Sequence, residues 1–143
     1  MTRTFDIIVC DEKDFMREKI AGVLSRIGMV RIVGQAAEVA AMKNVVGKFC
    51  PDIILIDLLL AAAEAETVAE VMKICTGAIL LLYSGDLVEY QDFASQIHVG
   101  KRIRINDIET EVIKYCVRQR TLEKRVGNAL LQQVTAAHKE AGL

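Results

Sequence analysis

The sequence predicts an α/β fold with a single doubly wound, five-stranded parallel sheet that is flanked by helices. Apolar runs of strand length alternate with segments of helical period, and the alternation gives five strand-helix units. The runs at 6–10 and 52–57 are hydrophobic almost throughout, which is typical of parallel strands buried on both faces. Repeated units of this kind, joined by right-handed crossovers, build one parallel sheet.

The first two units contain strands at 6–10 and 31–35 and helices at 14–27 and 38–49. Asp14 is a suitable N-cap for the first helix, and Gly28 is a suitable residue to end it. The apolar spacing of this helix predicts an inward face made of Phe15, Ile20, Val23, Leu24 and Ile27.

The last three units contain strands at 52–57, 78–83 and 102–105, with helices at 66–75, at 87–98 and from 108 onward. Pro51 precedes the third strand, where a proline interrupts no ladder of hydrogen bonds. Strand alternation sends Arg102 and Arg104 to one face of an edge strand, toward solvent or a partner.

Residues 121–143 run beyond the alternating units and predict a C-terminal helical extension or linker after a domain at 1–120. Apolar residues recur there near helical spacing: Leu122, Val126, Leu130, Val134 and Ala137. The segment spans barely two heptads and contains Gly127, so two alternatives stay open. It either pairs with a partner helix or leads into an output domain, or it lies as a frayed amphipathic helix over its own domain.

Composition limits the classes of function. A chain of 143 residues with 52% hydrophobic content is long enough for one domain with a proper core. Its net charge of −1 gives no overall positive potential that would attract nucleic acid. No apolar run has the length of a membrane span. We therefore expect a cytoplasmic protein without nucleic-acid or membrane contacts. The four cysteines lack metal or redox spacing and are expected to be separate buried thiols.

Three carboxylates follow two of the predicted strands. Asp11 and Glu12 come after the first strand, and Asp57 ends the third. Because ligand sites of open α/β sheets lie beyond the carboxyl ends of the strands, these acids are expected to share one crevice. Clustered carboxylates need a cation, and oxygen ligands favour Mg²⁺, which would draw a phosphoryl group to Asp57. The simpler alternative is that Asp11 caps a helix and Asp57 only ends a strand.

The end of the fourth strand adds a small hydroxyl and a glycine, Ser84 and Gly85. With Asp11-Glu12, Asp57 and Ser84 in this order at these strand ends, residues 5–120 resemble the receiver domain of two-component response regulators, of the chemotaxis-regulator type. The resemblance implies a flavodoxin-like sheet of order 2-1-3-4-5. It also implies a signalling module rather than an enzyme.

The resemblance assigns a role to each of these residues. Asp57 is the expected phosphoacceptor, and Ser84 is expected to hydrogen-bond the phosphoryl group. Glu12, Asp11, Asp57 and the backbone carbonyl of Leu59 are the expected Mg²⁺ ligands. The expected phosphoryl donor is a histidine kinase or a phosphotransfer protein, and a homodimer or output domain would contact the fifth strand and the last helix.

The sequence departs from the family pattern at three places. Asn106-Asp107 stands where the family usually has lysine and proline, and Ile103 stands where it often has an aromatic switch residue. Asn106 is also a suitable N-cap, with Glu109 three residues on. The segment 61–66 lacks the usual proline and glycine and favours helix, so the loop after Asp57 is expected to be shortened or partly helical.

These departures keep a rival interpretation open, namely a phosphorylation-independent pseudo-receiver that acts through protein contacts. A haloacid-dehalogenase-like phosphatase is disfavoured, because it would need an aspartate at the position of Leu59. Nucleotide-binding glycine loops are absent from the sequence, and neither His98 nor His138 belongs to a recognisable catalytic triad.

Overall fold

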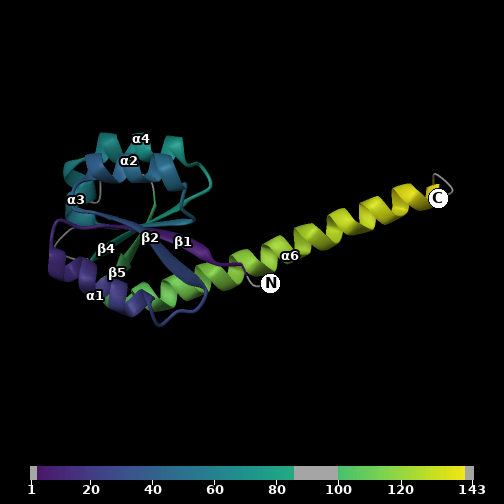
Figure 1. Ribbon diagram of the computed structural model, residues 1–143, viewed down its shortest axis with the longest axis horizontal. Coiled ribbons are helices and arrows are strands. Elements are labelled where there is room, and N and C mark those ends of the chain that lie inside the picture. Colours follow the sequence, from purple (N-terminus) through teal and green to yellow (C-terminus); the bar gives the residue numbers. More distant parts are fainter. Residues whose placement is uncertain (1–2, 86–99, 141–143) are drawn as a thin grey trace.

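The computed structural model describes residues 3–85 and 100–140. Its centre is a five-stranded sheet in the order β2-β1-β3-β4-β5, in which every pair of neighbouring strands is parallel (Figure 1). The strands are β1 (Phe5–Cys10), β2 (Val30–Ala36), β3 (Ile53–Asp57), β4 (Ile79–Ser84) and β5 (Lys101–Arg104). The predicted fold class and strand order are confirmed.

Helices cover both faces of the sheet. Figure 1 shows α2 (Val39–Phe49), α3 (Leu58–Ala63) and α4 (Ala65–Ile74) over one face. The other face carries α1 (Asp14–Leu24) and the first part of α6 (Ile108–Glu140), which follows a 3-10 turn at Ile105–Asp107. The helix expected at 87–98 lies outside the described residues.

Two apolar cores explain why the inner strands β1, β3 and β4 are almost continuously hydrophobic. Alternate residues of a strand point to opposite faces, and here both faces are buried. Toward α2 and α4, Ile8, Ile54 and Leu82 pack with Met42 and Val71. On the opposite face, a second set packs against α1 and α6: Phe5, Ile7, Val9, Ile53, Leu55, Leu81, Tyr83, Ile20, Leu24 and Val112.

The structure corrects three details of α1. Lys13 is the N-cap and Asp14 is the first helical residue, so Asp14 does not cap the helix. The helix ends at Leu24, four residues before Gly28. Phe15 is 64% exposed, because the inward stripe follows the i, i+4 spacing of Met16, Ile20 and Leu24 and leaves Phe15 on another side.

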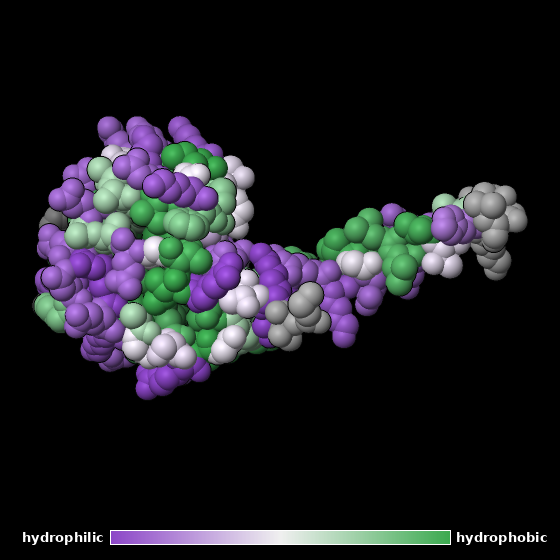
Figure 2. Space-filling view, viewed as in Figure 1, coloured by the Kyte–Doolittle hydropathy of each residue, from purple (hydrophilic) through white to green (hydrophobic). Residues whose placement is uncertain are grey.

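α6 has two different parts. In the first, Ile108, Val112 and Cys116 are buried against the sheet at intervals of four residues. From 121 to 138 every side chain is exposed, and the helix projects away from the domain with apolar residues on its surface (Figures 1 and 2). The predicted C-terminal helix is confirmed, and its residues 121–138 do not pack over the domain in this structure. The domain boundary at 120 stays a prediction. Within the described ranges, no helix is long and apolar enough to cross a membrane.

Candidate functional site

A cavity of about 390 Å³ lies beyond the carboxyl ends of β1, β3 and β4. It brings together the acids that the sequence singled out, because Asp11, Glu12 and Asp57 all line it. Lys13 and Tyr83 also line it. The prediction that these acids share one crevice is therefore confirmed, and the cavity is the candidate site.

Asp57 occupies the junction between β3 and α3. Its Oδ2 accepts a 3.1 Å hydrogen bond from the backbone amide of Leu60 and thereby caps α3. Burial raises the pKa of the half-buried carboxyl, as do the nearby Asp11 and Glu12, while the Leu60 amide and the charge of Lys13 lower it. The carboxylate is thus partly desolvated and yet open to the cavity.

Asp11 is almost fully buried, with 3% of its surface exposed. Its Oδ1 accepts a 2.9 Å hydrogen bond from the Lys13 amide, and its Oδ2 accepts a 2.7 Å hydrogen bond from the Tyr83 hydroxyl. The Arg17 guanidinium donates to its backbone carbonyl. Burial and the bond to Asp11 raise the pKa of Tyr83, so its hydroxyl stays protonated and donates at neutral pH.

The hydroxyl that faces the cavity belongs to Tyr83, whereas the sequence pointed to Ser84. Ser84 is 2% exposed, and its Oγ has no hydrogen-bond partner in the part of the chain that the structure describes. Consecutive strand residues point to opposite faces, which separates these two hydroxyls. The sequence contained one signal for Tyr83. It is an aromatic residue with a polar hydroxyl at the end of an otherwise aliphatic strand, at the edge of the sheet where Asp11 and Asp57 were expected.

The segment after Asp57 is helical, as expected from its alanines. In α3, Leu58, Ala61 and Ala62 are buried, and Leu59 lies in the first turn at the cavity wall. Helical geometry directs the carbonyl of a residue toward the amide four positions on, which for Leu59 is that of Ala63. A role of the Leu59 carbonyl as a metal ligand therefore stays a prediction.

The donor chemistry of the cavity fits Mg²⁺, which prefers oxygen ligands and commonly uses one or two carboxylates together with water. Asp11, Glu12 and Asp57 provide such oxygens. Nevertheless, among residues 3–85 and 100–140 no three His, Cys, Asp or Glu side chains lie close enough to hold a metal jointly. Hydrogen bonds within the protein already engage both carboxylate oxygens of Asp11.

The end of β5 supplies no cation to the cavity. Asn106 is exposed in the 3-10 turn, which runs directly into α6, so the predicted capping role of Asn106 is wrong. Lys101 instead pairs with Glu111 at 2.7 Å. Ile103 is buried while Arg102 and Arg104 are exposed, as strand alternation predicts. Among the described residues that line the cavity, Lys13 is the only cation.

No protein-family model matches the chain, and no curated protein matches its sequence. Solved structures do match. The signal receiver domain of the response regulator NarL from Mycobacterium tuberculosis is 23% identical with a TM-score of 0.55, over 81% of this chain and 95% of that one.

Two further solved structures are similar. The isolated receiver domain of RcsB from Salmonella enterica is 13% identical with a TM-score of 0.63, over 78% of this chain and 84% of its own. The response regulator domain of Thermotoga maritima CheB is 12% identical with a TM-score of 0.57, over 81% and 96%. This chain therefore has the receiver-domain fold.

Proposed function

We propose that the chain is a receiver-type signalling module that accepts a phosphoryl group on Asp57. The observation that carries this proposal is the position of Asp57 at the carboxyl end of the central strand, half-buried at a cavity that it shares with Asp11, Glu12 and Lys13. Ligands of open α/β sheets bind at this edge.

Asp57 would act as the nucleophile. Its Oδ2 is held by the Leu60 amide, which orients the carboxylate. Attack of a carboxylate oxygen on the phosphorus breaks the bond to the donor's leaving group and forms a mixed anhydride on Asp57, which water later hydrolyses. Lys13 would offset part of the added negative charge. Mg²⁺, held by Glu12, Asp57 and Asp11, would supply further charge neutralisation when bound.

The partners follow from this chemistry. The phosphoryl donor would be a histidine kinase or a phosphotransfer protein, acting on a cytoplasmic receiver without nucleic-acid or membrane contacts of its own. A homodimer partner or an output domain would receive the signal through β5 and α6. The exposed Arg102 and Arg104 and the projecting part of α6 support that assignment, because they are surfaces that the domain itself leaves uncovered.

A second candidate is a pseudo-receiver that works through protein contacts without phosphorylation. The hydrogen bond from Tyr83 to Asp11 favours it, because that bond occupies an oxygen that a metal would need. The absence of a β5 cation from the described wall of the cavity also favours it, since less charge is available to stabilise a phosphoryl group.

Labelling with an acyl phosphate in the presence of Mg²⁺, followed by intact mass, distinguishes the two functions. The receiver proposal predicts a gain of one phosphoryl group in the wild type, lost in Asp57→Asn and retained in Asp107→Asn, which removes an exposed carboxylate in the 3-10 turn after β5. Labelling that persists in Asp57→Asn would overturn the assignment of Asp57. An unlabelled wild type would support the pseudo-receiver.

A further inference from the structure

The ends of α2 and α4 bring two cysteines to the same edge of the domain, away from the acidic cavity. Both helices follow strands of a parallel sheet, pack against each other and run in the same direction (Figure 1). Cys50 is the C-cap of α2, and Cys75 is the C-cap of α4. The topology therefore pairs positions that are far apart in the sequence.

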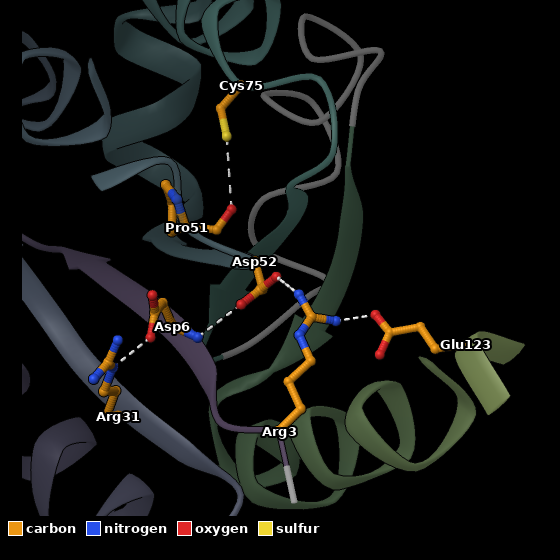
Figure 3. Close-up of polar contacts among 7 residues, drawn as sticks. All are labelled: Arg3, Asp6, Arg31, Pro51, Asp52, Cys75 and Glu123. Atoms are coloured by element: carbon orange, nitrogen blue, oxygen red, sulfur yellow. Dashed lines mark hydrogen bonds and ion pairs between the residues drawn. The ribbon is translucent and has the colours of Figure 1, made fainter. Parts of the chain in front are cut away.

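Cys50 and Cys75 line a common cavity of about 390 Å³ together with Pro51. The Cys75 thiol lies 3.7 Å from the carbonyl oxygen of Pro51, the residue next to Cys50 (Figure 3). Burial and the neighbouring Cys50 thiol raise the pKa of Cys75 to about 11. The two thiols are thus neighbours at the wall of one cavity, where Cys75 is buried and Cys50 is exposed.

Cys50 differs from the other three cysteines because it is exposed. It also has a left-handed backbone with φ of 40°, which non-glycine residues seldom adopt. Cys10 and Cys116 are fully buried in the two separate cores. The expectation of four separate buried thiols is therefore wrong for Cys50, because the helix end turns its side chain outward.

We propose that Cys50 and Cys75 form an oxidisable thiol pair that closes to an intrachain disulfide when the chain meets hydrogen peroxide. The exposed Cys50 sulfur attacks one peroxide oxygen, the O–O bond breaks, and Cys50 becomes a sulfenic acid with release of water. The Cys75 sulfur then attacks the Cys50 sulfur and displaces the hydroxyl, which leaves as water with the Cys75 proton. Two thiols and one peroxide give one disulfide and two waters.

The bond would fasten the ends of α2 and α4 beside a polar network at the same edge. There the Asp52 carboxylate accepts from the Asp6 amide at 2.8 Å and from the Arg3 guanidinium, which also contacts Glu123 of α6 (Figure 3). This edge lies at the opposite end of the strands from the cavity that contains Asp57.

The test uses the reduced full chain, one equivalent of hydrogen peroxide, denaturation, thiol alkylation and intact mass. The wild type is expected to keep two alkylatable thiols, Cys10 and Cys116. Digestion without reduction is expected to give a Cys50–Cys75 crosslinked peptide, and a non-reducing gel is expected to show no linked dimer. Four alkylatable thiols, a bond between any other pair, or a linked dimer would overturn the proposal.

Two variants separate the roles of the pair. Cys75→Ser is expected to leave Cys50 as a sulfenic acid that dimedone captures, whereas Cys50→Ser is expected to keep all three remaining thiols. A disulfide in Cys50→Ser, or no capture in Cys75→Ser, would contradict the assigned order of attack. Because Cys50 is exposed, its replacement by serine leaves the packing of the fold unchanged.

Discussion

The hydroxyl of Tyr83 donates a 2.7 Å hydrogen bond to Oδ2 of Asp11. Tyr83 comes from β4 and Asp11 follows β1, so the bond reaches across the intervening strand β3. It satisfies a buried carboxylate and at the same time occupies an oxygen that a bound metal would use. At the proposed Mg²⁺ site, this hydrogen bond is expected to weaken metal binding, because the Tyr83 hydroxyl and the metal would share the charge of one Asp11 oxygen.

Replacing Tyr83 with phenylalanine tests this expectation. Loss of a hydrogen bond to a buried charged group is expected to lower the free energy of unfolding by about 1–3 kcal/mol, measured by urea denaturation. The freed Asp11 oxygen is expected to strengthen Mg²⁺ binding, which a Mg²⁺ titration monitored by backbone amide chemical shifts measures. Tyr115→Phe, on a half-buried tyrosine of α6, is the matched control. Equal Mg²⁺ affinity in Tyr83→Phe and the wild type would contradict the account.

The raised pKa of Asp57 in the folded protein predicts that the free energy of unfolding depends on pH. Burial raises its pKa in the folded state, so its contribution to stability is fully present below the unfolded pKa of about 3.9 and is lost as pH rises through the folded pKa. Asp57→Asn is thus expected to be more stable than the wild type at pH 7, and the difference is expected to vanish below about pH 4. Urea denaturation across this range measures it, and a constant difference would count against the desolvation of Asp57.

Lys13 predicts an electrostatic effect on phosphorylation. As the only cation on the described wall of the cavity, it is expected to favour an incoming phosphoryl group. Since exposed charge pairs are weak, Lys13→Gln should slow labelling by an acyl phosphate about two- to five-fold. Lys13→Arg should restore the rate, and Lys19→Gln, on an exposed lysine of α1, should leave it unchanged. Equal rates in all four proteins would exclude a role for Lys13.

The projecting part of α6 predicts a gradient of hydrogen exchange. Amides near Val112 and Cys116 lie under buried side chains and are expected to exchange slowly. Amides from 124 to 138 belong to a helix whose side chains are all exposed, and an unsupported helix of this length is marginal in water. Hydrogen exchange, measured by mass spectrometry, should therefore be much faster at 124–138 than near Val112 and Cys116. Equal protection along α6 would show that a partner covers its projecting part.

The inner strands β1, β3 and β4 were predictable because both of their faces are buried, which leaves the nearly unbroken apolar runs that the sequence displays. The position of Asp57 was predictable because it is the one charged residue within the apolar run 53–60, where a buried strand is expected to reach the edge of the sheet. Phe15 was misplaced because two apolar stripes of α1 differ by one residue, and only packing against the sheet decides between them.

The detailed arrangement of the cavity was not predictable. Whether Tyr83 or Ser84 turns its hydroxyl toward Asp11 depends on the exact end of β4, and element ends are the least certain part of a sequence-based assignment. The contact between Cys50 and Cys75 depends on where two helices end in space. Neither feature leaves a periodic pattern in the sequence.

The most direct test of the central claim identifies the phosphorylated residue itself. The wild-type chain is treated with an acyl phosphate and Mg²⁺, reduced with borohydride, which converts a phosphorylated aspartate into homoserine, and digested for peptide mapping. The receiver account predicts homoserine at position 57 alone, in the peptide that carries the end of β3. Homoserine at Asp11 or Asp107, or at no position, would contradict it.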